Sequence, residues 1–551
     1  MKTISNSGVF TNFYDNNRIY IDKTETIYKL LMTQDKVFIS RPRRFGKTLT
    51  LKTIGTLFEK GVDPYFKDTW IYDKWTESTY PVLYLDFLKC SVSDIDDFKE
   101  DLVELISVFA NTYNIEGYKE SSEPQRALNR LLTLLELKNY KVVVLIDEYD
   151  RQLVANINNP ELYEKFCEII RSIYATLKSC DSIKFLAVTG VTRLKDATIF
   201  SVGSDIVDIS NKSAYSQLIG FTRDEIKTFY IDYLKLAASY DNNVSVDCIT
   251  ETQIDAILDK IAYNYDGYCF DEDYEKKVFS TWSVNNFLQS IIEKEKVHFG
   301  DYWFDNGGLP SILAKNIEQS KINLFDYLNK DHLIEVSRNS FLNPTSLLDI
   351  DNNVLLCQTG YLTLRSPLSS GDSIISLGFP NREVYDSLTQ LMAIKALKKE
   401  TSVNVDGKNI LDEGNAKQII DLFNTALNTV SYDKFPLNSE ASVQGYICVY
   451  LKAAGAKVSA EVHSSKGRAD LVIERLNRRI VIELKYADSD PLAKTKLNEA
   501  IEQIKNRDYG NILPQKELLR IAAVYNSDPH VRAIREYQQV EWHILPTRLK
   551  F

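Results

Sequence analysis

The sequence predicts a multidomain α/β protein, and three features of its pattern carry this prediction. Over the first 235 or so residues, short apolar runs alternate with helical patterns, which indicates a parallel sheet covered by helices on both faces. From about residue 222 the pattern becomes mostly helical. The last 115 or so residues return to mixed helices and strands, as in a compact α/β module. The chain has 551 residues, enough for roughly two to four domains.

The N-terminal strands are predicted from apolar runs at four places, with helices between them over about 94–113, 123–138 and 161–178. The C-terminal module is predicted to contain a helix over 442–454, a strand over 457–462, a hairpin, a helix over 492–504 and a strand over 518–525. The four N-terminal strands are Val37–Ser40, Pro81–Phe87, Val142–Ile146 and Ile183–Thr189.

Changes in this pattern divide the chain into five segments. Residues 1–221 form the strand-and-helix domain, and residues 222–330 a helical lid. Short strands around a hairpin turn predict a winged-helix-like connector over 331–400. A polar helical linker, 401–437, leads to the last domain, 438–551.

Composition narrows the class of protein. Hydrophobic residues make up 44% and charged residues 26%, which is ordinary for globular domains. No apolar run approaches the roughly 18–20 residues of a membrane span, and the N-terminus lacks a secretory hydrophobic segment. The seven cysteines are scattered and contain no CxxC, which favours a reducing compartment over disulfides or zinc. We therefore expect a cytoplasmic protein without a membrane partner.

Charge is distributed unevenly along the chain. The net charge of −10 argues against affinity of the whole protein for nucleic acid. Residues 440–551, however, hold 18 basic and 14 acidic side chains, so this part carries +4 and the remainder −14. A polyanion would therefore meet the C-terminal part, although ordinary fluctuation of composition explains the asymmetry equally well.

A phosphate-binding loop is predicted at Arg41-Pro-Arg-Arg-Phe-Gly-Lys-Thr48, between a short strand and a helix. Its first glycine is replaced by Arg41, so the pattern GxxxxGK[ST] is matched only in part, and a basic turn before a surface helix is the alternative. Lys47 would reach the β- and γ-phosphates of ATP, and Thr48 would hold Mg²⁺. Further positive charge beside the phosphates is expected from Arg41, Arg43 and Arg44, and the loop that contacts the nucleotide includes Arg44, Phe45 and Gly46.

Two acids follow the third strand, in Val142-Val-Val-Leu-Ile-Asp-Glu-Tyr-Asp150. Asp147 would hold Mg²⁺, and Glu148 would polarise the attacking water. The acid pair and the intervening strand indicate the additional-strand class of nucleotide hydrolases, which includes AAA+ enzymes. After the fourth strand, Thr189 is a candidate sensor of the γ-phosphate, and Arg193 a candidate contact to it or to a neighbouring subunit; a strand end with a polar loop is the simpler explanation for both.

The C-terminal hairpin carries two acids and a lysine. Asp470 lies on one strand, and Glu483 and Lys485, two residues apart, share one face of the next. Two carboxylates suit Mg²⁺ or Mn²⁺, and Lys485 would position or activate water. Glu440 is a further candidate metal ligand, and Gln503 a candidate to orient Lys485 or the substrate. The alternative is a salt-bridged hairpin. Arg468, before Asp470, would be free to touch phosphate.

These strings together resemble a bacterial family that couples an AAA-ATPase-like domain to a C-terminal PD-(D/E)XK nuclease domain. The phosphate-loop string is specific to that family, in which the first glycine is normally absent. The resemblance implies that Lys47 and Thr48 are the phosphate-loop pair, and that Asp147 and Glu148 are the Mg²⁺ and catalytic acids. It also implies a restriction-endonuclease-like fold with Asp470, Glu483 and Lys485 as the nuclease triad, and Glu440 as a less securely matched helical acid. The other strings are Tyr20-Ile-Asp-Lys-Thr24, Ile146-Asp-Glu-Tyr-Asp150, Thr189-Gly-Val-Thr-Arg193, Tyr265-Asp-Gly-Tyr268, Trp282-Ser-Val-Asn285, Gly360-Tyr-Leu362, Gly467-Arg-Ala-Asp470 and Ile482-Glu-Leu-Lys485.

Two functions fit these features. The first is an ATP-binding and ATP-hydrolysing, metal-dependent nuclease that cleaves phosphodiester bonds, with DNA favoured over RNA and with the ATPase domain regulating or driving cleavage. Its cofactors would be ATP and Mg²⁺, with Mn²⁺ as an alternative at the nuclease site, and the ATPase domain could form a homo-oligomer. The second is a nucleotide switch that binds nucleic acid or a protein partner and whose nuclease fold is inactive.

Overall fold

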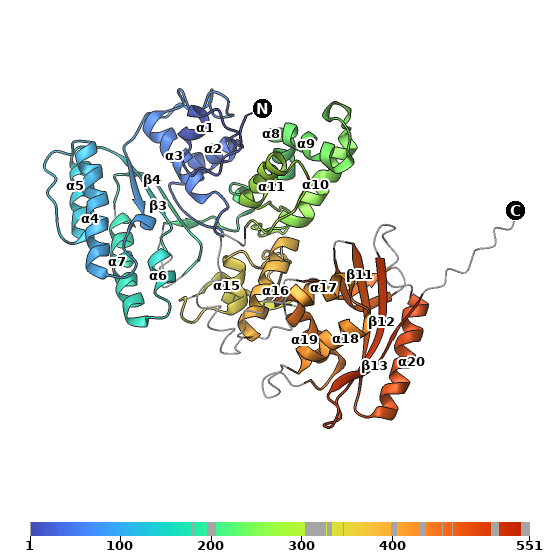
Figure 1. Cartoon of the computed structure of the whole chain (residues 1–551). Coiled ribbons are helices and arrows are strands. Elements are labelled where there is room, and N and C mark those ends of the chain that lie inside the picture. Colours follow the sequence, from blue (N-terminus) through green and yellow to red (C-terminus); the bar gives the residue numbers. More distant parts are fainter. Residues whose placement is uncertain are drawn as a thin grey trace. The chain divides into compact units, whose positions relative to one another are not determined.

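The structure is a computed structural model of the whole chain (Figure 1). It describes residues 2–178, 180–194, 205–303, 327, 333–344, 346–397, 405–428, 437–453, 456–464, 467–475, 477–507 and 517–541. The chain divides into two compact units, residues 1–313 with 333–385 and residues 314–332 with 386–551. Within the described residues, no helix combines the length and apolar composition that crossing a membrane requires.

A five-stranded parallel sheet forms the centre of the first unit. Its strand order is β2-β3-β4-β1-β5, so β4 lies between β1 and β3. This inserted strand confirms the predicted additional-strand topology. All six residues of β3 are buried, which explains its unbroken apolar sequence. The strands are β1 (Lys36–Ser40), β2 (Val82–Asp86), β3 (Val142–Asp147), β4 (Ile183–Gly190) and β5 (Val207–Asp208).

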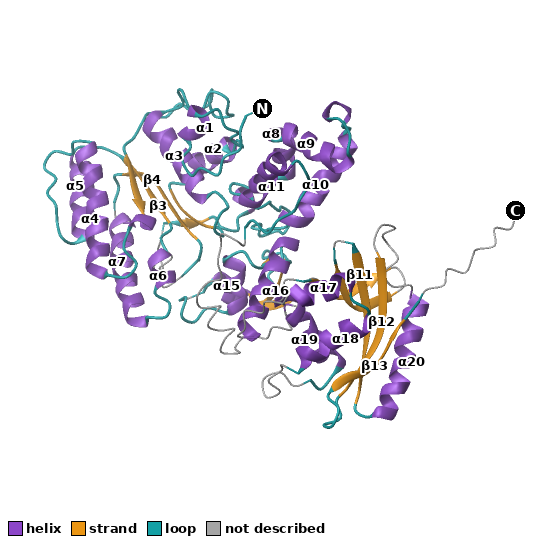
Figure 2. Ribbon diagram, in the orientation of Figure 1, coloured by secondary structure: helices purple, strands orange, loops and turns teal. Residues whose placement is uncertain are grey.

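Helices cover both faces of this sheet. Helix α3 packs on β2, β3 and β4, and Figure 1 shows α4, α5 and α7 together on the other side. The secondary structure in Figure 2 gives the strand–helix alternation predicted from the sequence. The helices are α1 (Thr11–Asp15), α2 (Thr24–Thr33), α3 (Lys47–Lys60), α4 (Ile95–Thr112), α5 (Pro124–Leu137), α6 (Arg151–Ala155) and α7 (Pro160–Lys178).

The predicted lid begins with four helices, α8 (Arg223–Phe229), α9 (Ile231–Asn242), α10 (Glu251–Tyr265) and α11 (Thr281–Lys294). Capping boxes at Thr222 with Glu225 and at Thr250 with Gln253 fix the starts of α8 and α10. Their apolar faces form one core that also takes in Ile4, Ile19 and Ile21 from the N-terminal segment. The remainder of the predicted lid, from residue 304, lies outside the described residues except Tyr327.

A small sheet of order β6-β8-β7 completes the first unit. The predicted helix end at Gly360 is confirmed, because Gly360 has φ +91° and follows α15 closely. The predicted hairpin is also present as β7 and β8, whereas β6 was not predicted. The elements are β6 (Ile334–Ser337), α14 (Arg338–Leu342), α15 (Asn352–Gln358), β7 (Thr363–Leu364), β8 (Ile374–Gly378) and α16 (Arg382–Leu397), which continues past residue 385 into the second unit.

The second unit has a mixed five-stranded sheet of order β13-β12-β11-β10-β9. Strands β10 and β11 are antiparallel, and β11 and β12 are parallel. The predicted elements of this module are all present, and β13 is an additional edge strand. The elements are α17 (Val405–Glu413), α18 (Ala416–Leu427), α19 (Glu440–Ala453), β9 (Lys457–Ser464), β10 (Gly467–Glu474), β11 (Arg478–Ala487), α20 (Asp490–Arg507), β12 (Glu517–Asn526) and β13 (Ala533–Gln539).

The two faces of this second sheet have separate cores. Helices α17, α18 and α19 share one core with Leu471, Ile482 and Leu484. Helix α20 covers the other face, where it packs on Val472 and Val481. Because side chains alternate along a strand, Asp470, Glu483 and Lys485 lie on the α20 face. The sheet therefore sets the polar residues of the hairpin apart from its larger apolar core.

Candidate functional sites

The phosphate loop of the first unit turns on two residues with positive φ. Gly46, which precedes α3, has φ +103°, a conformation that glycine adopts without a steric penalty. Arg44 has φ +67°. These turns place Lys47 and Thr48 in the first turn of α3, directly after the loop that leaves β1. The loop thus presents the N-terminal end of a helix, which favours an anion.

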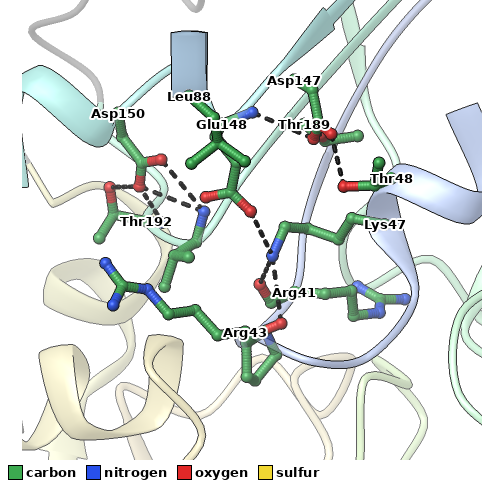
Figure 3. Close-up of polar contacts among 12 residues, drawn as sticks. Arg41, Arg43, Lys47, Thr48, Leu88, Asp147, Glu148, Asp150, Thr189 and Thr192 are labelled. Carbon is green, nitrogen blue, oxygen red and sulfur yellow. Dashed lines mark hydrogen bonds and ion pairs between the residues drawn. The ribbon is translucent and has the colours of Figure 1, made fainter. Parts of the chain in front are cut away.

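Lys47 is buried and lies between the loop and the acids of β3 (Figure 3). Its Nζ donates to the carbonyl oxygens of Arg41 at 3.1 Å and Pro42 at 3.2 Å. It also lies 3.2 Å from Oε1 of Glu148. The predicted phosphate-binding lysine and the predicted water-polarising glutamate therefore form an ion pair.

Asp147 is tied to two threonines from different elements. Thr48 Oγ1 donates to its Oδ2 at 2.6 Å, and Thr189 Oγ1 donates to its Oδ1 at 2.5 Å. Burial raises the pKa of Asp147, and the two hydrogen bonds oppose that shift only in part. The hydroxyl and carboxylate oxygens are ligands that Mg²⁺ prefers, so the donor set fits this ion. The sequence predicted Thr48 and Asp147 as Mg²⁺ ligands and Thr189 as a γ-phosphate sensor, and in the structure hydrogen bonds join the three.

One prediction for the loop is wrong. The guanidinium of Arg41 does not add charge beside the phosphates, because it is buried over the ring of Phe270, 4.2 Å from its centroid. It donates to the carbonyl of Ser210 at 2.6 Å. Burial lowers the pKa of Arg41 to about 9. An arginine in place of the first glycine thus anchors the loop to the fold, with its side chain turned inward.

The other loop residues divide between packing and exposure. Phe45 is buried edge-to-face against Tyr268, at 4.7 Å between ring centroids. Arg44 lies over the ring of Trp282 at 4.3 Å, a cation–π contact to helix α11. Arg43 is exposed, and Figure 3 shows its guanidinium extending past the loop toward the neighbourhood of Asp150 and Thr192. The loop is therefore connected to the lid through aromatic side chains.

Arg193 lies apart from the phosphate loop cavity. Its Nε forms a short ion pair with Asp208 of β5, and its backbone exchanges hydrogen bonds with Gln358. Thr189, four residues earlier in β4, does reach the site through Asp147. The contact of Arg193 with a γ-phosphate or a neighbouring subunit remains a prediction.

A cavity of about 470 Å³ opens beside this loop. It is lined by the loop, by Glu148 and Asp150, by the N-terminal segment around residues 5–8, and by the lid at Trp282 and Asn285. Asn285 Nδ2 donates to Oδ1 of Asn6 at 2.9 Å, which ties the N-terminal segment to the lid. The cavity has cations and a helix N-terminus beside it, and its walls combine polar and apolar side chains. Such a cavity suits a nucleotide.

In the second unit, three carboxylates from three elements meet one lysine. Lys485 Nζ lies 3.0 Å from Glu483 Oε1, 3.3 Å from Glu440 Oε1 and 3.8 Å from Asp470 Oδ2. Asp470 also accepts a hydrogen bond from the backbone N–H of Leu484 at 2.8 Å. Glu440 begins α19, Asp470 is on β10, and Glu483 and Lys485 are on β11. The structure thus brings together four of the five residues that the sequence proposed for this site, all but Gln503.

Burial and charge act against each other at Lys485. Burial alone would lower its pKa, but Glu483, Asp470 and Glu440 outweigh that effect, so the pKa is raised. The Glu483 side chain is fully buried, whereas that of Glu440 is 40% exposed. Among the described residues, no group of three or more His, Cys, Asp or Glu side chains is arranged to hold a metal ion. In this arrangement the ammonium takes the position between the carboxylates.

The carboxylates still offer the donor type that Mg²⁺ and Mn²⁺ prefer, and Mg²⁺ is commonly held by one or two of them. Gln503 is half-buried on α20, which covers the same sheet face, but it is not among the partners of Lys485. Its role therefore stays a prediction. The side chain of Arg468 lies outside the described residues.

Sequence reasoning missed several residues around the first site. Tyr149, Asp150 and Thr192 connect the loops after β3 and β4, although both strings had been noted as distinctive. Trp282 and Asn285 also belong to a string that had been noted without a role. These residues lie in strings that stood out in the sequence. Their contacts join residues far apart along the chain, so only the folded structure shows them.

Comparisons with known proteins agree with this geometry. Residues 7–200 match a family model described as a predicted AAA-ATPase, and residues 438–534 match a model of the PD-(D/E)XK nuclease superfamily. A protein of Azotobacter chroococcum mcd 1, described as an uncharacterized protein in the vnfD 5′ region, is 25% identical over 504 residues, 89% of each chain. A crystal structure of Cdc6p from Pyrobaculum aerophilum overlaps 69% of this chain and 93% of its own at 11% identity, but its TM-score of 0.22 supports no conclusion. The two family matches confirm the resemblance drawn from the sequence.

Proposed function

We propose that this chain, which carries a predicted AAA-ATPase domain and a PD-(D/E)XK nuclease superfamily domain, is an ATP-hydrolysing, metal-dependent nuclease whose ATPase domain regulates or drives cleavage. The observation that carries the proposal is the convergence of Glu440, Asp470 and Glu483 on Lys485. A plain salt-bridged hairpin would pair the lysine within its own two strands, whereas Glu440 comes from a separate helix. The ATPase half rests on the contacts of Lys47, Thr48, Asp147 and Glu148.

In the first unit, the residues have separable tasks in ATP hydrolysis. Lys47 would exchange its contact with Glu148 for the β- and γ-phosphate oxygens. Glu148 would then accept a proton from the water whose oxygen attacks the γ-phosphorus, while the bond from that phosphorus to the β–γ bridging oxygen breaks and ADP leaves. Thr48 and Asp147 would hold Mg²⁺, which neutralises charge on the phosphates when bound. Thr189 keeps Asp147 oriented through its hydroxyl.

In the second unit, the residues would act on a phosphodiester. Asp470 and Glu483 would hold Mg²⁺ or Mn²⁺, which supplies Lewis-acid stabilisation of the phosphate charge when bound. Lys485 would orient the attacking water or stabilise the negative charge that develops on the phosphate oxygens. Glu440 and Gln503 would assist by completing the polar shell and orienting the substrate. Water would add to phosphorus as the P–O bond to the leaving sugar oxygen breaks.

The substrate is expected to be nucleic acid, with DNA favoured over RNA. The +4 charge of residues 440–551 would attract the phosphate backbone, so binding should weaken as salt rises. We further propose that the ATPase domain forms a homo-oligomer and that the protein works in the cytoplasm.

The nuclease half is tested with purified protein on plasmid, linear duplex, single-stranded DNA and RNA, each with and without ATP and with Mg²⁺ or Mn²⁺. Asp470→Asn should remove cleavage while substrate binding falls much less, because the substitution removes a metal ligand and keeps the shape. Surviving cleavage in Asp470→Asn would assign the activity to a contaminant or another site.

The ATPase half is tested separately. Lys47→Ala should abolish ATP binding, whereas Glu148→Gln should bind ATP without hydrolysing it, because only the water-polarising group is lost. Undiminished ATP affinity in Lys47→Ala would discard the phosphate-loop assignment.

A nucleotide switch with an inactive nuclease fold is the second candidate. The position of the Lys485 ammonium between the carboxylates favours it, since a metal ion would have to displace that ammonium. Absence of cleavage on every substrate, together with ATP-dependent binding of nucleic acid or a protein, would select this function.

A further inference from the structure

The loop after β3 is fastened to the loop after β4 by a buried carboxylate. We propose that Asp150 is a positioning residue that holds Glu148 in place to polarise the attacking water, an inference that rests on the proposed ATPase function. Asp150 is buried two residues after Glu148, and it lines the same cavity as Glu148. Neither the family matches nor the phosphate-loop pattern gives this residue a task.

The hydrogen bonds given for the carboxylate of Asp150 lead to one loop, the segment after β4. Its Oδ2 accepts from Thr192 N at 2.6 Å, from Thr192 Oγ1 at 2.5 Å and from Val191 N at 3.2 Å (Figure 3). These donors belong to the segment that follows Thr189, the residue that hydrogen-bonds Asp147. The carboxylate of Asp150 therefore ties the segment carrying Glu148 to the segment carrying Thr189.

Tyr149 adds two hydrogen bonds to the same connection. Its backbone N–H donates to the carbonyl of Thr189 at 3.1 Å, and its phenol donates to the carbonyl of Thr192 at 3.1 Å. The ring is buried edge-to-face against Phe38 of β1, at 5.5 Å between centroids. The tyrosine thus anchors this clamp, defined as residues 149–150 with 189–192, to the central sheet.

The clamp holds the backbone of Glu148 in a conformation that is unfavourable by itself. Glu148 has φ +52°, in the left-handed region that a non-glycine residue adopts only at an energetic cost. Gly190 lets the two loops approach, because a Cβ there would lie 2.5 Å from the Tyr149 ring and 2.8 Å from Asp150 Oδ1. Left-handed backbone at a residue that faces the cavity persists only where its neighbours hold it.

This arrangement directs Glu148 toward Lys47, the lysine proposed to bind the phosphates of ATP. Its carboxylate lies against Lys47, on the cavity side of the loop, in the same view that shows Asp150 turned the other way toward Thr192 (Figure 3). Loosening the clamp would leave Lys47, Thr48 and Asp147 to bind MgATP, but would release the backbone that aims Glu148. The effect should therefore fall on turnover and spare binding.

The experiment measures ATP turnover and ATP binding in the full-length protein. Asp150→Asn replaces one of two accepting carboxylate oxygens with an NH2 group, which cannot accept from the N–H groups of the clamp. We expect kcat to fall about tenfold with the Kd for MgATP within about twofold. Thr192→Val removes one donor and should lower kcat about threefold, whereas Thr192→Ser keeps the hydroxyl and should restore the rate. Thr56→Val is the matched control, because the buried Thr56 hydroxyl donates to the carbonyl of Lys52 at 2.7 Å within α3, outside the clamp, and its loss should not affect kcat.

A double-mutant cycle separates positioning from general damage. If Asp150 acts through Glu148, Asp150→Asn should cause no further loss of the slow residual single-turnover rate that remains in a Glu148→Gln background, where steady-state hydrolysis is lost. Three outcomes would each overturn the inference. They are the same tenfold loss in that background, a parallel loss of MgATP affinity, and a wild-type kcat in both Asp150→Asn and Thr192→Val. Should Asp150→Asn not fold, the Thr192 pair decides alone. A wild-type protein without ATP turnover would instead overturn the proposed ATPase function, and this inference with it.

Discussion

The two candidate sites each place a lysine against acids, but they compensate its charge differently. In the phosphate-loop site, Lys47 contacts one carboxylate, Glu148, and two backbone carbonyls. In the hairpin site, Lys485 contacts three carboxylates. The acids of the first site have their own neutral donors, since threonine hydroxyls hold Asp147 and backbone amides hold Asp150.

This difference shows which site depends on its lysine for its structure. In the first site, neutral donors keep the acids in position, so Lys47 is available for a ligand. In the second, Lys485 is the cation that balances a fully buried glutamate and two further acids. Removing one partner of a buried ion pair is strongly destabilising because it leaves the other charge uncompensated. The predictions that follow test this contrast.

The largest effect is expected for Lys485→Met. The substitution keeps the side-chain volume but leaves Glu483 without its ammonium partner, so the second unit should lose about 3 kcal/mol of stability at pH 7 as well as cleavage. The raised pKa of Lys485 means that its stabilisation is complete below the ordinary lysine pKa and is lost only as pH rises through the higher folded pKa. Chemical denaturation at pH 7 measures the difference from wild type.

Lys505→Met is the control for that substitution. Lys505 pairs with Glu502 at 3.3 Å on the exposed surface of α20, with both side chains more than half exposed. Such surface pairs contribute little, so stability should change by less than about 0.5 kcal/mol. Equal losses in Lys485→Met and Lys505→Met would contradict the view that the lysine at the hairpin site supports its structure.

Lys47→Met should affect function more than stability. ATP binding should be lost, because the phosphate contact is removed, while the unfolding free energy falls by only about 1 kcal/mol, since Glu148 can turn toward water. Isothermal titration with ATP and thermal unfolding of the same sample give both numbers. A loss of stability as large as that of Lys485→Met would remove the distinction between the sites.

Asp147→Asn should separate stability from turnover. Burial raises the pKa of Asp147, so its ionised form disfavours the folded state above the ordinary aspartate pKa, and stability from this group falls as pH rises through that range. At pH 7 the amide should therefore raise the melting temperature of the nucleotide-free protein by a few degrees. ATP turnover should fall roughly 100-fold, equivalent to ~2.7 kcal/mol. A melting temperature below wild type would show that the threonine hydrogen bonds outweigh the cost of burial.

The smallest effect is expected for Arg193→Ala. Its ion pair with Asp208 places the guanidinium at β5, outside the cavity beside the phosphate loop. We expect ATP turnover within about twofold of wild type and a stability loss of about 1 kcal/mol, as for a partly exposed pair. A tenfold loss of turnover that depends on protein concentration would support the predicted contact of Arg193 with a neighbouring subunit.

Local pattern was sufficient for the elements with strong periodicity. The unbroken apolar run of β3 and the run Ile480-Val-Ile482 in β11 each predicted a strand and, through it, the positions of Asp147, Glu483 and Lys485. The short strand β5 and the edge strand β13 were missed, because two residues are too few to show a periodicity and an edge strand has only one paired side. Spacing of two along a strand also predicted that Glu483 and Lys485 would meet.

The sequence by itself determined the order of the elements, the two acid-and-lysine sets and the helix that follows the phosphate loop. Only the tertiary structure decided that Arg41 turns inward to Ser210, that Arg193 pairs with Asp208, and that Asp150 clamps Thr192. Each of these contacts joins residues at least 15 positions apart along the chain. Their partners are chosen by the packing of whole strands and loops, which residue type and spacing do not encode, whereas periodicity along one element follows directly from backbone geometry.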